Sequence, residues 1–233
     1  MSASHTRVDP RDSVLPPWVK QSARAALAPV VRLAQALHLT PNAITVLGLL
    51  ITIVASTLVA GGWLLLGAAI LTAGSLLDAV DGALARAQGG GTPFGGFLDS
   101  TLDRAGEAVL FAGIAAWFLF HQPDPRWAVM LAIAALGASF LVSYAHARAQ
   151  GIGLAADVGL APRTERLVIT IAGVALAGIG FTAGLYAALA VVAALSLVTV
   201  AQRIRHVWHL SRAGAAPDAS VPPSSSSTPS KEK

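Results

Sequence analysis

Four long stretches of the chain contain no Asp, Glu, Lys or Arg, and they constrain the fold more than any other feature. They cover residues 33–77, 108–123, 127–147 and 167–202. A helix that crosses a bilayer needs about 20 mostly apolar residues, and apolar runs of this length satisfy their backbone groups in lipid by forming helices. Only 12% of the 233 residues are charged, against about 25% in soluble domains. The sequence therefore predicts an all-α integral membrane protein.

Glycine-rich and polar turns divide the apolar stretches into six expected transmembrane helices. Of the 16 Lys and Arg residues, Arg126 alone falls in a loop that this scheme places outside. The positive-inside rule then puts both termini in the cytoplasm of a protein of the cell membrane. The basic residues are too scattered to indicate nucleic acid as a partner. The expected spans are 43–61, 64–85, 96–119, 127–147, 167–184 and 186–203.

The flanking segments differ in composition from the apolar region. Residues 1–15 are expected to be disordered, and 16–39 alternate apolar and basic residues in the pattern of an amphipathic helix lying on the cytoplasmic interface. A plain juxtamembrane linker is the alternative for this segment. The catalytic domain is expected over 40–210, followed by a polar, disordered tail over 211–233. The chain has no cysteine, which excludes disulfides and thiolate sites.

Four acidic residues interrupt the apolar pattern near one loop. Asp78 and Asp81 stand three residues apart on one predicted helix, and Asp99 and Asp103 stand four apart on the next. Each spacing puts both carboxylates on one helix face. The connecting loop is short, so these helices are expected to be antiparallel neighbours whose acidic faces converge.

Four carboxylates so close together repel one another strongly in a membrane unless cations lie among them. Oxygen ligands favour Mg²⁺, Mn²⁺ or Ca²⁺. Four carboxylates together suggest a two-metal site that catalyses phosphoryl chemistry. Polar helix-packing contacts and a divalent-cation transporter are the alternatives. Nearby residues suit a phosphate-bearing substrate: Gly82 permits close approach to the backbone, Arg86 offers a fork of donors, and Thr92 follows a glycine triplet.

The acids belong to a longer motif, D-x2-D-G-x2-A-R-x8-G-x3-D-x3-D, which runs without a gap from Asp78 to Asp103. The motif resembles the signature of the CDP-alcohol phosphotransferases (phosphatidyltransferases). The resemblance implies six transmembrane helices, a homodimer, and a cytoplasm-facing cavity with two divalent ions, Mg²⁺ or alternatively Mn²⁺. It also implies that all four aspartates are metal ligands, that Asp103 is the catalytic base, and that Gly82 and Arg86 contact the CDP portion.

Further blocks are similar to the phosphatidylinositol-phosphate synthase branch of this family. In that branch the entry to the first span touches the CDP-lipid, and two later segments hold inositol phosphate. The implied reaction moves a phosphatidyl group from CDP-diacylglycerol to an alcohol, here inositol phosphate, and releases CMP. The implied CDP-lipid contacts are Asn42, Ala43, Ile44, Thr45 and Thr92, and the implied acceptor contacts are Ser143, His146, Arg148, Arg163 and Arg166.

Some features leave the acceptor open. The branch typically has a lysine where His146 stands, although a histidine can also donate to a phosphate. Arg148, Arg163 and Arg166 are alternatively plain positive-inside anchors. The main rival acceptor is glycerol 3-phosphate, as used by phosphatidylglycerophosphate synthases, but the sequence before Asp103 departs from that branch. Glu107 continues the face of Asp99 and Asp103 without an assigned role.

Overall fold

The structure is a computed structural model that describes the backbone of residues 40–87 and 92–212, and the side chains of 40–76 and 92–212. This part of the chain is all helical and contains no strand. Three expected features lie outside the described residues: the disorder of residues 1–15, the interfacial helix over 16–39 and nearly all of the tail over 211–233. The six helices are α2 (Pro41–Ala60), α3 (Leu64–Ala87), α4 (Pro93–His121), α5 (Arg126–Gly151), α6 (Arg163–Gly178) and α7 (Thr182–Arg212).

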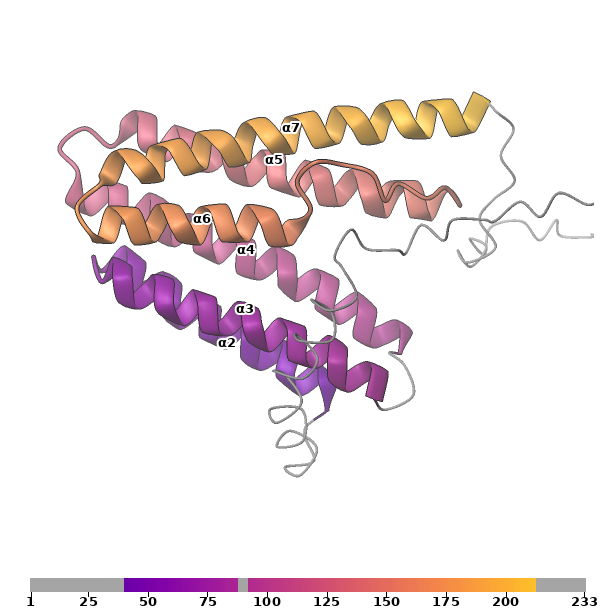
Figure 1. Cartoon of the computed structure of the whole chain (residues 1–233), viewed down its shortest axis with the longest axis horizontal. Helices are drawn as coiled ribbons and strands as arrows, with labels where there is room; N and C mark the ends of the chain where they lie inside the picture. Colours follow the sequence, from indigo (N-terminus) through magenta and orange to yellow (C-terminus); the bar gives the residue numbers. More distant parts are fainter. Residues whose placement is uncertain (1–39, 88–91, 213–233) are drawn as a thin grey trace, which may run out of the picture.

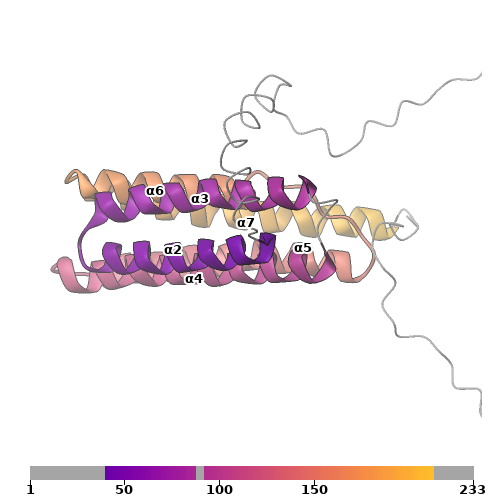
Figure 2. The same ribbon diagram turned by 90° about the horizontal axis from the view of Figure 1, so that it is seen from below.

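The helices alternate in direction and lie side by side along one long axis (Figures 1 and 2). α2, α4 and α6 begin at the same end of the bundle, where α3, α5 and α7 finish. We call this the charged end, because Asp103, Glu107 and most of the described arginines lie toward it. Short connections at 61–63, 122–125 and 179–181 close the opposite end.

Close approach of helix backbones holds α2 between α3 and α4. A Cβ placed on Gly113 of α4 would lie 2.5 Å from the carbonyl oxygen of Ser56 on α2, so only glycine permits this approach. Ala55 and Val59 of α2 pack with Ile114 and Phe118 of α4 in the same buried core. α3 and α4 both pack extensively on α2, and the two helices line a small cavity of about 40 Å³ together with α2 and α6.

Several helix boundaries differ from those expected, and local chemistry explains the differences. α4 begins at Pro93 because the Thr92 hydroxyl accepts a hydrogen bond from the amide of Gly95 at 3.0 Å, an N-cap followed by proline at the first position. α6 starts earlier than the expected 167, directly after Pro162. The prediction that the last helix starts at 186 is wrong, because α7 begins at Thr182 and continues to Arg212, well past 203.

Three of the described helices, α2, α5 and α7, are long and apolar enough to cross a membrane. Their outer surfaces carry large apolar side chains such as Leu50, Val54 and Ile133, as expected of a lipid-facing surface. The described side chains of α3, Leu64–Leu76, form a shorter apolar segment, and α4 carries four charged residues in its first half. α6 has 16 residues, a length of about 24 Å at 1.5 Å per residue.

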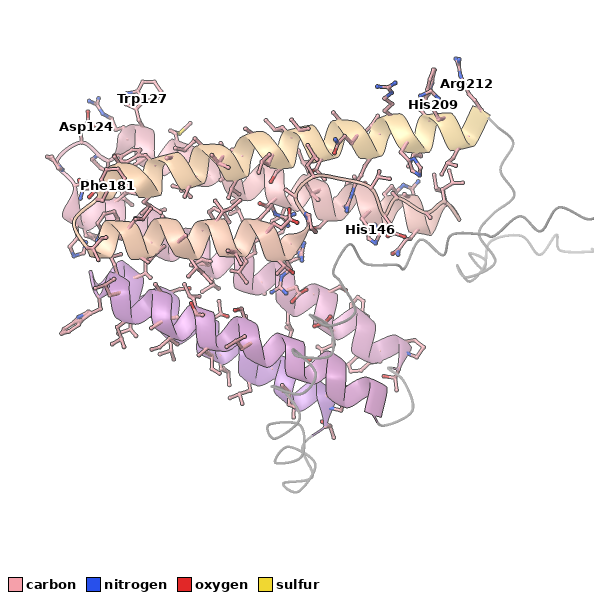
Figure 3. The ribbon with its side chains drawn as sticks, in the orientation of Figure 1. Asp124, Trp127, His146, Phe181, His209 and Arg212 are labelled. Atoms are coloured by element: carbon pink, nitrogen blue, oxygen red, sulfur yellow. The ribbon has the colours of Figure 1, made fainter. Side chains whose placement is uncertain are left out.

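The end opposite the charged end is rimmed by aromatic side chains. Trp127 is 80% exposed and Phe181 lies beside it on the same rim (Figure 3). Asp124 and Arg126 form an exposed ion pair there with an Nε–Oδ1 distance of 2.9 Å, and the hydrogen bond from Arg126 lowers the pKa of the Asp124 carboxyl. Exposed aromatic rings of this kind are typical of the membrane–water interface.

Candidate active site

The first turns of α4 present two of the four motif aspartates. Asp99 is exposed, and the side chain of Asp103, one turn further along the same face, is 17% exposed. Asp78 and Asp81 lie in the second half of α3, which finishes at the same end of the bundle. The side chains of Asp78, Asp81, Gly82 and Arg86 are outside those that the structure describes, so the convergence of the four acids stays a prediction.

The two described carboxylates fit the chemistry of the expected metal site. Asp99 and Asp103 offer oxygen ligands of the kind that Mg²⁺ and Mn²⁺ prefer, spaced one helical turn apart. The described side chains include no cluster of three or more His, Asp or Glu residues with metal-binding geometry. A complete set of ligands therefore depends on the two acids of α3.

The beginnings of α2 and α4 meet beside these acids. A Cβ built on Gly95 of α4 would lie 3.1 Å both from the Asn42 Oδ1 atom of α2 and from the Thr92 hydroxyl oxygen. Asn42 and Thr92, both expected to contact the CDP-lipid, are thus brought together at two parallel helix N-termini. Ala43 is exposed there, whereas the side chain of Ile44 is buried in the packing between helices.

Asp103 lies between two groups of expected substrate residues. It lines a cavity of about 20 Å³ together with Thr45 of α2 and Arg163 of α6. The Arg163 Nη1 atom is 2.8 Å from Asp103 Oδ1, and the neighbouring Arg104 Nη2 atom is 3.6 Å from Asp103 Oδ2. Arg163 therefore connects the motif helix α4 to α6.

A larger cavity of about 560 Å³ opens on the other side of Arg163, at the charged end between α4, α5, α6 and α7. We call it the basic pocket. It is large enough for a small polar substrate, and the described residues that line it include no carboxylate. Its polar lining consists mainly of Ser100, Thr101, Arg104, Ser143, Tyr144, His146, Gln150, Arg163, Arg166 and Arg203.

Behind the wall of the basic pocket, Glu107 connects two of these arginines. Its Oε1 atom accepts hydrogen bonds from Arg166 Nη2 at 3.2 Å and Nε at 3.4 Å, and its Oε2 atom is 3.7 Å from Arg104 Nη1. Arg166 is 2% exposed and also donates to the carbonyl oxygen of Ala161 at 2.9 Å. Arg104 continues the chain of contacts by donating to the Ser143 hydroxyl.

The connection between α5 and α6 is held against α7 beside the pocket. Arg203 donates to the carbonyl oxygens of Val158 at 3.0 Å and Val142 at 2.6 Å. Gly159 adopts φ +142°, and a Cβ there would lie 2.3 Å from the Thr199 methyl group, so this loop can approach α7 so closely only with glycine. His146, at the pocket rim (Figure 3), lies 3.4 Å from the Ala156 carbonyl oxygen through Nδ1.

Four of the five expected acceptor residues, Ser143, His146, Arg163 and Arg166, thus line one pocket, although their role stays a prediction. Arg148 does not line it: its side chain is exposed in the last turn of α5. Sequence reasoning missed Arg104, Glu107 and Arg203 as neighbours of the pocket. The sequence held a signal for the first two, because Arg104 and Glu107 are charged residues that follow Asp103 in an otherwise apolar, membrane-spanning pattern. Arg203 gave no such signal, since it resembles an ordinary anchoring arginine at the end of a span.

The geometry can be compared with known proteins. A family model of the CDP-alcohol phosphatidyltransferases matches residues 38–208, which include all of α2, α3, α4, α5 and α6. The chain belongs to the CDP-alcohol phosphatidyltransferase family. It is therefore an enzyme of this class, and the transporter alternative is set aside.

Relatives within the CDP-alcohol phosphatidyltransferases are similar over most of the chain. The phosphatidylinositol phosphate synthase of Mycobacteroides abscessus is 41% identical over 170 residues, 72% of this chain and 77% of that protein. A crystal structure of the Mycobacterium tuberculosis phosphatidylinositol phosphate synthase with CDP-DAG bound matches with a TM-score of 0.73 and 35% identity, covering 78% of this chain and 93% of that one. The same protein in complex with manganese and citrate matches with a TM-score of 0.73 and 34% identity, covering 78% and 88%.

Proposed function

We propose that this enzyme transfers the phosphatidyl group of CDP-diacylglycerol to the hydroxyl of inositol phosphate and releases CMP. The observation that carries the choice of acceptor is the basic pocket, which is lined by four arginines, two of which pair with Asp103. The names of the relatives support the same substrate pair. The pocket alone suits any phosphorylated polyol, and the relatives favour inositol phosphate over glycerol 3-phosphate.

The charge of the pocket supports a phosphorylated acceptor. Among the described side chains, Arg104, Arg163, Arg166 and Arg203 contribute four positive charges, and the carboxylates that pair with three of them, Asp103 and Glu107, contribute two negative charges. A phosphate monoester carries close to two negative charges at pH 7, so it would balance this cluster. An unphosphorylated alcohol would leave the excess charge in place.

The CDP-lipid fits the other side of Asp103. The N-termini of α2 and α4 bring the positive ends of two helix dipoles close together, which favours a pyrophosphate. Asn42, Thr45 and Thr92 add polar side chains there. Gly82 and Arg86 of α3 complete the proposed CDP-binding set, with Ala43 and Ile44 contributing backbone and packing.

Asp78, Asp81, Asp99 and Asp103 are proposed to hold two divalent ions, with Mg²⁺ as the physiological metal and Mn²⁺ able to replace it. Bound ions would neutralise the pyrophosphate and stabilise the charge that develops on the leaving CMP. The manganese in the solved relative supports a divalent requirement. Ligand residues on two helices would also bring the ends of α3 and α4 together.

The protein residues have separate roles in the proposed reaction. The arginines of the basic pocket orient the acceptor phosphate so that a hydroxyl of the inositol ring faces the lipid-side phosphorus of the donor. Asp103 accepts the proton of that hydroxyl as its oxygen forms the new P–O bond. The bond to the CMP oxygen breaks, and CMP leaves as an anion. Arg163, paired with Asp103, aligns the base with the acceptor.

The proposed placement in the membrane puts the charged end in the cytoplasm. All six helices would span the cell membrane, including α3, α4 and the short α6, whose charged or short portions lie where water-soluble substrates enter. The aromatic rim around Trp127 and Phe181 would mark the outer interface. A homodimer is proposed on the family resemblance.

Product analysis tests this proposal. Purified protein is incubated with CDP-diacylglycerol, inositol phosphate and Mg²⁺, and the lipid fraction is analysed by mass spectrometry while CMP is quantified. The proposal predicts phosphatidylinositol phosphate and CMP in a one-to-one ratio. CMP release that yields phosphatidic acid alone, or the same lipid product without inositol phosphate, would exclude it.

A further inference from the structure

Glu107 has no place in the motif of the four aspartates, yet it is the most buried of the described carboxylates near the site. Its side chain is 10% exposed and lies one helical turn beyond Asp103 on α4. Burying a carboxylate costs free energy, because the charge loses its hydration and must be compensated by partners. Its partners therefore indicate what it does.

Both partners of Glu107 are arginines of the basic pocket. Arg166 approaches Oε1 with two nitrogen atoms, at 3.2 and 3.4 Å, and Arg104 approaches Oε2 at 3.7 Å. This side-on contact, in which Nε and Nη2 share one carboxylate oxygen, restricts the plane of the Arg166 guanidinium as well as its position. The carbonyl oxygen of Ala161 holds Nη1 of the same guanidinium at 2.9 Å, so Arg166 is anchored from two sides.

Glu107 itself is placed to act on these arginines and away from the substrate. The basic pocket is lined by Arg104 and Arg166 but has Glu107 behind its wall, where the carboxylate lines the separate cavity of about 40 Å³ between α3, α4 and α6. A carboxylate in direct contact with the acceptor phosphate would repel it. Behind Arg104 and Arg166, the Glu107 carboxylate instead holds both guanidinium groups in place and leaves their other sides open to the basic pocket.

We propose that Glu107 is a positioning residue that fixes Arg166 and Arg104 in the wall of the basic pocket and thereby sets the affinity for the phosphorylated acceptor. The contact continues through Arg104 to the Ser143 hydroxyl on α5, so one carboxylate on α4 aligns donors that come from α4, α5 and α6. This proposal rests on the proposed function, because it assumes that the acceptor phosphate enters the basic pocket. The proposed role requires the negative charge of Glu107 at this position.

The test replaces Glu107 with Gln in the full-length protein and measures KM for both substrates by CMP release. We expect KM for inositol phosphate to rise about tenfold, because Arg166 and Arg104 lose the carboxylate that holds them in the pocket wall. KM for CDP-diacylglycerol should change less than about twofold, because these two arginines are proposed to contact the acceptor and not the CDP-lipid. Glu107→Asp keeps the charge and should restore most of the acceptor affinity. The matched control is Asp124→Asn, which also removes a carboxylate from an Asp–Arg pair but at the opposite end of the bundle, and should leave both KM values unchanged.

A double-mutant cycle separates positioning from a general structural role. If Glu107 acts through Arg166, then adding Glu107→Gln to an Arg166→Gln variant should raise the acceptor KM by less than about threefold more. Effects that multiply in full, or an acceptor KM in Glu107→Gln within twofold of the unmodified protein, would overturn the proposal. Should Glu107→Gln fail to fold, Glu107→Asp provides the comparison: an increase of both KM values by the same factor, of more than about threefold, would overturn the positioning role.

Calorimetric binding of inositol phosphate, measured without CDP-lipid, distinguishes this proposal from the proposed function. Binding that is weakened about tenfold by Glu107→Gln supports the positioning role even if the protein transfers no phosphatidyl group to inositol phosphate. Binding that is equal in the two proteins contradicts the positioning role even if transfer occurs. Failure of the proposed function would appear instead as absent product in the unmodified enzyme.

Discussion

The guanidinium of Arg163 on α6 lies 2.8 Å from the carboxylate of Asp103 on α4. The two residues come from parts of the chain separated by a whole helix and a loop, and the pair lies where the cavity shared with Thr45 adjoins the basic pocket. Arg163 lines both cavities. It therefore lies between the proposed base and the proposed acceptor, and its replacement should affect more than substrate affinity.

Arg163→Ala is expected to lower kcat as well as raise the acceptor KM. The alanine removes a cation from the pocket and also removes the nearer of the two arginines that pair with Asp103, which misaligns the proposed base. A charge-assisted contact contributes about 1.5–3 kcal/mol, so kcat/KM for the acceptor should fall about tenfold or more. Steady-state kinetics check this. A change confined to protein yield would reduce Arg163 to an anchor of α6.

Arg166→Ala and Arg148→Ala form a matched pair on the charged end. Arg166 is buried in the wall of the basic pocket, whereas Arg148 is exposed at the end of α5 and lies outside its lining. Arg166→Ala should raise the acceptor KM about tenfold or more with little change in the CDP-diacylglycerol KM. Arg148→Ala should change either KM by less than about twofold. The reverse order would place the acceptor phosphate outside this pocket.

Asp103→Asn separates the proposed base from the other proposed metal ligands. An amide preserves the shape of the side chain but cannot accept the hydroxyl proton, so turnover should fall by at least about a hundredfold while CDP-diacylglycerol still binds. Asp78→Asn should instead first raise the Mg²⁺ concentration needed for half-maximal activity. Both are read from CMP release over a Mg²⁺ titration. Turnover retained in Asp103→Asn would remove this residue from the base role.

His146→Lys tests the departure of this chain from the related branch. His146 lies at the rim of the basic pocket, with Nδ1 3.4 Å from the Ala156 carbonyl oxygen and 3.7 Å from Asp157. A lysine adds a permanent positive charge and a longer reach, so the acceptor KM should fall or stay unchanged. His146→Ala provides the comparison and should raise it. A higher KM in the lysine variant would show that His146 shapes the loop and does not meet the phosphate.

The sequence predicts the helical class and the approximate position of each helix, because uncharged runs and the turn residues that separate them are both local signals. It also predicts that Ser143, His146, Arg163 and Arg166 act in one place, although they come from two helices, because the family resemblance carries information that the spacing alone lacks. The start of α4 at Pro93 was within reach of the sequence, since Thr92 and Pro93 form a recognisable cap.

The packing of the bundle could not be predicted in the same way. The placement of α2 between α3 and α4 depends on the close approach of Gly113 to Ser56, which no spacing reveals. The roles of Glu107 and Arg203 depend on partners far along the chain. Glu107 pairs with Arg166, and Arg203 donates to the carbonyl oxygens of Val142 and Val158. For such residues the sequence shows an isolated charge, and the fold supplies the partner.

The central claim is that the basic pocket selects a phosphorylated polyol, and acceptor specificity tests it most directly. The measurement is kcat/KM for CMP release from CDP-diacylglycerol with inositol phosphate, glycerol 3-phosphate and unphosphorylated inositol under the same conditions. The account predicts that kcat/KM with inositol phosphate exceeds that with inositol by at least about a hundredfold, as expected when several buried or partly buried cations are left without their anion. It also predicts a higher kcat/KM with inositol phosphate than with glycerol 3-phosphate. Equal or higher kcat/KM with unphosphorylated inositol would contradict it.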